Sequence, residues 1–108
     1  MSEYIEIYPT DAQDLISKNK GNSNFVIVDV RTDKEFGKGH IEGALHYDVY
    51  DADFEKKILA LDKAKVYVVY CRVGARSRAT AEFMVENGFG QVYTVRGSMF
   101  ESEEDLEE

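Results

Sequence analysis

The chain has 108 residues, a formal net charge of −8 at pH 7 and one cysteine, Cys71. This length predicts one domain that buries roughly two thirds of its unfolded surface, so that no disulfide or metal staple is needed, and a single cysteine excludes an internal disulfide. The negative charge argues against non-specific binding to nucleic acid and to anionic membranes.

The distribution of apolar residues indicates where the protein resides. No apolar run approaches the roughly 20 residues that a membrane-spanning helix requires. Acidic residues interrupt the N-terminal segment, as at Glu3 and Glu6, so that it does not resemble a secretory signal. We therefore expect a cytoplasmic protein with no membrane partner.

The first third of the chain predicts a strand, a helix and a second strand. Residues 4–8 alternate between apolar and polar side chains, which is typical of a short strand. Thr10, with Gln13 three positions later, predicts the cap of a helix. Residues 25–30 are apolar on both faces except for Asp29, which is the pattern of a central parallel strand.

The next elements are shorter. Thr32 and Glu35 have the spacing of a capping box and predict a short helix that Gly37 and Gly39 end. Residues 40–47 predict a turn followed by a brief strand.

The second half repeats the alternation of helix and strand. Helical spacing predicts an amphipathic helix over residues 51–61, and β-forming residues predict strands over 66–70 and 92–95. Between these strands, residues 77–87 predict a helix that Gly88 stops. Its inward side chains are expected to be Ala79, Phe83 and Met84.

Strands that alternate with helices predict an α/β domain with a mainly parallel sheet and a ligand site beyond the carboxyl ends of the strands. We assign this domain to residues 1–100. Residues 101–108 form an acidic tail that is expected to be disordered and solvated.

Cys71 stands at such a carboxyl end, where the strand 66–70 meets a loop and then a helix. Backbone N–H groups of a loop and of a helix N-terminus favour an anion, and therefore a thiolate. Four residues separate Cys71 from Arg76, one fewer than in the phosphate-binding loop of cysteine phosphatases. The shorter loop suits a single sulfur atom, and Gly74 permits the sharp turn that it needs, with φ above zero.

Three segments together resemble the single-domain rhodaneses, which are sulfurtransferases that carry sulfur as a cysteine persulfide. They are Asp29-Val30-Arg31 with Glu35-Phe36, Gly39-His40-Ile41-Glu42-Gly43-Ala44, and Cys71-Arg72-Val73-Gly74-Ala75-Arg76-Ser77. The resemblance implies a small α/β domain with a five-stranded, mostly parallel sheet and helices on both faces.

The resemblance also implies a chemistry. Cys71 is the expected nucleophile, and the expected anion-binding loop comprises Arg72, Val73, Gly74, Ala75, Arg76 and Ser77. Sulfur from thiosulfate or a persulfide donor would pass through a Cys71 persulfide to cyanide, a thiol or a partner protein, in a two-step reaction. The expected partners are thus a small anionic sulfur donor and a thiol or protein acceptor. No metal, flavin or nucleotide cofactor is needed.

Other polar residues are assigned supporting roles. Asp29 ends a buried strand and is expected to be structural, either paired with Arg31 or capping a turn, because a carboxylate beside a thiolate would oppose the ionisation of the thiol. His40 follows Gly39 in a turn and is expected to serve packing and hydrogen bonding, with general base as the lesser alternative, and His46 is no better a candidate for a base. One cysteine and two histidines at unrelated spacings do not make a metal site.

Two other function classes remain open on the sequence. A cysteine phosphatase or arsenate reductase would use a similar anion-binding loop, although this loop is one residue shorter and no aspartate offers itself as general acid. A non-catalytic binding or regulatory module of rhodanese-like fold is the other class, although such modules usually lack the cysteine that this chain retains.

Overall fold

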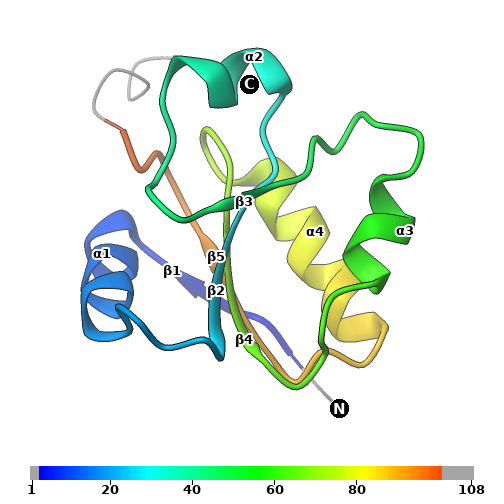
Figure 1. Cartoon of the computed structure of the whole chain (residues 1–108), viewed down its shortest axis with the longest axis horizontal. Coiled ribbons are helices and arrows are strands. Elements are labelled where there is room, and N and C mark those ends of the chain that lie inside the picture. The colour runs from blue at the N-terminus through cyan, green and yellow to red at the C-terminus, as the bar shows by residue number, and fades with distance from the viewer. Residues whose placement is uncertain (1–2, 101–108) are drawn as a thin grey trace.

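The computed structural model describes residues 3–100 as strands and helices in strict alternation (Figure 1). They are β1 (Ile5–Ile7), α1 (Pro9–Lys18), β2 (Phe25–Asp29), α2 (Asp33–Lys38), β3 (Leu45–His46), α3 (Phe54–Leu59), β4 (Val66–Tyr70), α4 (Ala75–Glu86) and β5 (Gln91–Val95). The predicted acidic tail, residues 101–108, lies outside the described residues.

The strands form one sheet with the order β1-β5-β4-β2-β3. Every neighbouring pair is parallel, so the predicted mainly parallel sheet is confirmed. The register places Val28 beside Val69 and Val68 beside Tyr93. The central strands β2 and β4 therefore end at the same edge of the sheet, where α2 also lies (Figure 1).

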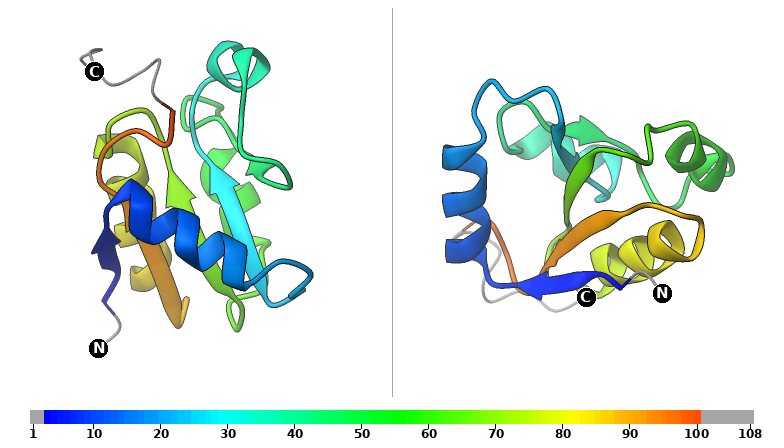
Figure 2. Two further views of the ribbon diagram at one scale, coloured as in Figure 1. Left: turned by 90° about the vertical axis from the view of Figure 1, so that its left-hand side faces the viewer. Right: turned by 90° about the horizontal axis from the view of Figure 1, so that it is seen from below.

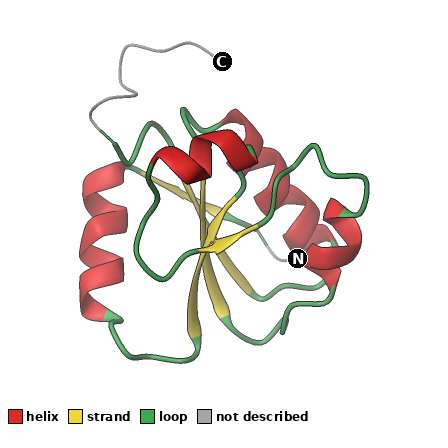
Figure 3. Ribbon diagram, turned by 45° about the horizontal axis from the view of Figure 1, so that its top comes forward, coloured by secondary structure: helices red, strands yellow, loops and turns green. Residues whose placement is uncertain are grey.

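Helices cover both faces of the sheet, as expected. Figures 2 and 3 show α1 against one face and α3 and α4 against the other. Because successive side chains of a strand point to opposite faces, Tyr67, Val69 and Cys71 pack on the α3–α4 side, whereas Val68 and Tyr70 pack on the α1 side. Tyr67 and Tyr70 are both core residues. No helix among residues 3–100 has both the length and the apolar character needed to cross a membrane.

The predicted cap of α1 is wrong. The helix begins at Pro9, directly after Tyr8, and Thr10 is already helical. Proline suits the first helical position because its ring fixes φ and it has no N–H to leave unsatisfied. The Asp11 carboxylate, one turn into the helix, accepts the backbone N–H of Tyr8 at 3.0 Å.

Three other helix predictions need correction. α2 runs through Gly37 to Lys38, so that only Gly39, its C-cap, ends it, and α3 spans only Phe54–Leu59 within the predicted 51–61. α4 begins two residues before the predicted start, and Ala79 is exposed. The buried residues of α4 are Ser77, Thr80, Ala81 and Met84. The apolar pattern did not predict the buried face of α4, because the first part of this helix directs polar side chains, Ser77 and Thr80, toward the protein interior.

Candidate active site

Cys71 directly follows β4, and its residue surface is fully buried. Its Sγ atom accepts the backbone N–H of Gly74 at 3.1 Å and that of Ser77 at 3.3 Å. Both donors belong to the turn that opens α4, so the fold directs two peptide dipoles at one sulfur atom. Such an arrangement stabilises negative charge on sulfur.

The Ser77 hydroxyl adds a third polar group. Its Oγ lies 3.5 Å from Cys71 Sγ, and it can donate to the Gly74 carbonyl at 3.1 Å. The buried Thr94 hydroxyl, from β5, donates to Ser77 Oγ at 3.0 Å. The sequence pattern missed Thr94, although a threonine at an inward position of a buried strand could have indicated a polar neighbour.

Gly74 has φ of +123°, which confirms the predicted positive φ and which side chains rarely tolerate. A Cβ atom there would meet the Val95 carbonyl oxygen at 3.3 Å and Arg96 Cα at 3.4 Å. The neighbouring Val73 carbonyl accepts the Gly97 N–H at 2.9 Å. The loop is thus held tightly against the end of β5, and this contact is possible because residue 74 has no side chain.

Arg76 makes a bidentate ion pair with Glu35 of α2, with Nη1–Oε1 at 2.8 Å and Nη2–Oε2 at 3.1 Å. Glu35 also accepts the backbone N–H and the hydroxyl of Thr32, which confirms the predicted capping box. The Arg76 hydrogen bond, opposed by partial burial, lowers the pKa of Glu35 to about 2. The sequence identified Glu35 as a cap but not as the partner of the loop arginine.

The remaining loop residues lie around this ion pair. Arg72 and Arg76 both line an open cavity of about 420 Å³, while Ala75 is exposed as the first residue of α4. Lys34, Lys38 and Tyr50, which the sequence pattern did not single out, line the same cavity. Cationic side chains from two separate segments therefore meet beside the cysteine loop.

Asp29 and Arg31 form the predicted ion pair, with Arg31 Nη2 2.8 Å from Asp29 Oδ2. Both residues are buried, and Arg31 also donates to the Gly39 carbonyl at 2.6 Å. The guanidinium lies 4.7 Å from the centre of the Phe100 ring, at a distance where cation–π attraction is significant. The pair joins β2 to the loop after α2 and does not contact Cys71 through any of these bonds.

The two histidines pack on one aromatic ring, as predicted for His40. The rings of His40 and His46 stack on Phe36, with centroids 3.7 Å and 4.2 Å away. His46 Nε2 donates to the Arg31 carbonyl at 2.8 Å. The His46 ring therefore joins Phe36 of α2 to the residues after β2, whereas the His40 ring packs on α2.

One cluster of carboxylates has a spacing that suits a metal ion. Ligand oxygens of Asp33, Asp48 and Asp51 lie within 4.8 Å of one another. Asp48 already accepts the backbone N–H groups of Asp33 at 3.2 Å and of Tyr50 at 2.9 Å. These bonds give the Asp48 carboxylate a structural role, because it closes the turn to Tyr50 and joins that turn to the start of α2.

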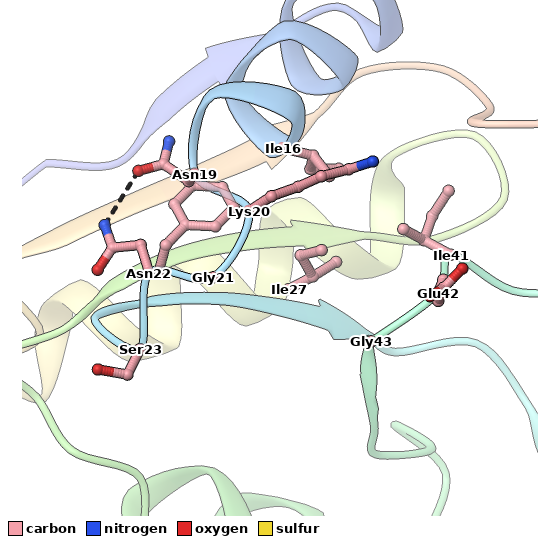
Figure 4. A pocket seen from close by; sticks show the side chains of 11 residues that line it. Ile16, Asn19, Lys20, Gly21, Asn22, Ser23, Ile27, Ile41, Glu42 and Gly43 are labelled. Carbon is pink, nitrogen blue, oxygen red and sulfur yellow. Dashed lines mark hydrogen bonds between the residues drawn. The ribbon is translucent and has the colours of Figure 1, made fainter.

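A second cavity, of about 600 Å³, lies on the α1 face (Figure 4). Ile16 and Ile27 form part of its wall, and Asn19 and Asn22, which are hydrogen-bonded to each other at 3.1 Å, lie at one end. Cys71 packs on the opposite face of the sheet. This cavity is therefore separate from the cysteine loop.

Comparison with known proteins places this geometry in a family. The Rhodanese-like domain model matches residues 9–105. The chain is 38% identical over 98 residues to thiosulfate sulfurtransferase GlpE of Pseudomonas fluorescens, covering 90% of this chain and 83% of the relative. It is 34% identical over 94 residues to the GlpE protein of Coxiella burnetii, covering 87% and 82%.

Solved structures agree with the sequence relatives. The SSP1007 protein of Staphylococcus saprophyticus superposes with a TM-score of 0.71 at 28% identity, covering 96% of this chain and 99% of that one. A rhodanese-related protein of Thermoplasma volcanium superposes with a TM-score of 0.68 at 26% identity, covering 87% and 86%. The chain belongs to the rhodanese-like domain family.

Proposed function

We propose that the protein is a sulfurtransferase that carries sulfane sulfur as a persulfide on Cys71. The observation that carries this proposal is the pair of backbone N–H groups, from Gly74 and Ser77, directed at Cys71 Sγ. The similarity to proteins named thiosulfate sulfurtransferase supports the same reaction class.

In the first step, the Cys71 thiolate attacks the outer sulfur of thiosulfate. A new S–S bond forms on Cys71, the S–S bond of thiosulfate breaks, and its electron pair leaves with sulfite. The persulfide that results is an anion at neutral pH, so the amides that favour the thiolate also favour the intermediate. In the second step, cyanide or a thiol attacks the outer sulfur and returns Cys71 to its thiolate.

The loop residues support these steps in different ways. Gly74 and Ser77 supply the N–H groups, and Val73 fixes the loop through its bond to Gly97. Arg72 and Arg76 line the adjacent cavity and give a dianionic donor a positive approach. Because Cys71 is buried, a group that covers Sγ must move aside for the donor to reach it. Asp29 and Arg31 support the fold at the edge of the sheet beside it.

The test is the formation of thiocyanate from thiosulfate and cyanide. The wild type should form thiocyanate, and Cys71→Ser should form none while keeping the circular dichroism spectrum and melting transition of a folded protein. A wild type that forms no thiocyanate but hydrolyses p-nitrophenyl phosphate would instead favour the phosphatase class. A wild type inactive in both assays would favour the non-catalytic module.

A further inference from the structure

The cavity beside the cysteine loop has a charge opposite to that of the whole chain. The chain has 21 acidic and 13 basic residues. Yet four cations line this cavity, with Glu35 as the only lining carboxylate among the described residues. They are Lys34, Lys38, Arg72 and Arg76. A concave surface lined mainly by cations concentrates anions even on a negatively charged protein.

The two lysines come from α2, whereas the two arginines come from the cysteine loop. Lys34 and Lys38 are four positions apart, so they lie on one face of this short helix. The Glu35 carboxylate on the same helix is paired with Arg76 and accepts a hydrogen bond from the Thr32 N–H. It therefore offsets part of the charge of Arg76, whereas Lys34 and Lys38 supply positive charge on the α2 side of the cavity.

The size of the cavity exceeds what a small sulfur donor needs. Its volume of about 420 Å³ lies in the range of roughly 300–1,000 Å³ that holds ligands of drug size. Thiosulfate is far smaller than such a ligand. A molecule that places one sulfur atom at the loop and reaches to α2 would use the lysines as well, and its distal end must be anionic to do so.

We propose that this cleft selects acceptor thiols that carry carboxylates, with Lys34 and Lys38 binding the carboxylates while the thiol faces Cys71. This inference rests on the sulfurtransferase function proposed above. The acceptor sulfur attacks the outer sulfur of the persulfide and forms a new S–S bond. The bond to Cys71 breaks with its electron pair on Cys71 Sγ, and the thiol proton passes to solvent, so that the product is the acceptor persulfide.

The experiment compares two thiols that differ in charge. With thiosulfate saturating, the acceptor is either mercaptosuccinate, which has two carboxylates, or mercaptoethanol, which has none. In the double variant Lys34→Gln/Lys38→Gln we expect the KM for mercaptosuccinate to rise about three- to tenfold, because each exposed ion pair is worth up to about a fivefold change in affinity. The KM for mercaptoethanol should not change.

The control is Lys18→Gln/Lys56→Gln, which removes the same charge from exposed sites on α1 and α3. This control should leave both constants unchanged. An equal rise for the two thiols, an equal effect in the control, or a change confined to the KM for thiosulfate would overturn the inference.

A second readout does not depend on sulfur transfer. Titration with succinate should shift the NMR signals of the α2 amides in the wild type and should not shift them in Lys34→Gln/Lys38→Gln. This result would support the carboxylate site even if the wild type formed no thiocyanate. The absence of thiocyanate would then contradict the proposed function but not the carboxylate site. A wild type that forms thiocyanate but shows no succinate shifts would overturn the carboxylate site and leave the proposed function intact.

Discussion

The ion pair between Glu35 and Arg76 should make a measurable and pH-dependent contribution to stability. The pKa of Glu35 falls from 4.5 to about 2, and one pKa unit corresponds to about 1.4 kcal/mol, which sets a ceiling of about 3 kcal/mol. The Glu35 side chain is 22% exposed, so that solvent screens the pair. We therefore expect Glu35→Gln to lower the free energy of unfolding by about 1–2 kcal/mol at neutral pH.

The sign of the pH dependence follows from the lowered pKa. A carboxyl whose pKa is depressed on folding stabilises the protein above its unfolded value, here 4.5, and this contribution is lost as the pH falls toward about 2. The difference between wild type and Glu35→Gln should thus be full at neutral pH and should shrink by more than half by pH about 3.

Urea unfolding of both proteins at the two pH values measures this difference directly. Glu82→Gln is the matched control, because it makes the same chemical change at an exposed site on α4. The reasoning would be refuted if Glu35→Gln and wild type differed equally at both pH values. It would also be refuted if Glu82→Gln caused a loss as large as that of Glu35→Gln.

Three further substitutions test the loop. Gly74→Ala should lower the free energy of unfolding by about 1–3 kcal/mol and reduce thiocyanate formation, because φ of +123° is strained for a residue with Cβ and that Cβ would press on the Val95 carbonyl oxygen at 3.3 Å; a melting temperature equal to wild type would contradict this. Thr94→Val should slow alkylation of Cys71 by iodoacetamide several-fold, since Ser77 Oγ loses the hydrogen bond that Thr94 donates. Thr80→Val, which also deletes a buried hydroxyl, should not slow it, and equal rates for the two variants would argue against a role of the Thr94–Ser77 hydrogen bond at Cys71. Arg76→Ala should raise the KM for thiosulfate about tenfold; an unchanged KM would exclude Arg76 from donor binding.

The sequence predicted those parts of the fold that depend on local pattern. The runs 25–30 and 66–70 are apolar on both faces because both faces of the sheet are covered, and they became β2 and β4. The capping box at Thr32 and Glu35 was also readable, since its partners are three residues apart. The start of α4 could not be predicted in this way, because its buried Ser77 donates its N–H to the Cys71 sulfur and is not part of an apolar face.

The parts of the site that the sequence did not predict are contacts between distant segments. Arg76 and Glu35 are 41 positions apart, and Thr94 and Ser77 are 17 apart. Nothing in the local pattern of either segment specifies such a partner, because it is the order of the parallel strands that brings them together. The lysine pair on α2 was missed for the same reason, since exposed lysines are common and only the fold shows that these two face the cysteine loop.

If Cys71 carries sulfur as a persulfide, the added sulfur atom is visible by mass spectrometry. Protein treated with thiosulfate, freed of excess reagent and digested should contain the Cys71 peptide with the mass of one added sulfur atom, which cyanide then removes. A Cys71 peptide of unchanged mass after thiosulfate treatment, in protein whose Cys71 still reacts with iodoacetamide, would contradict the account.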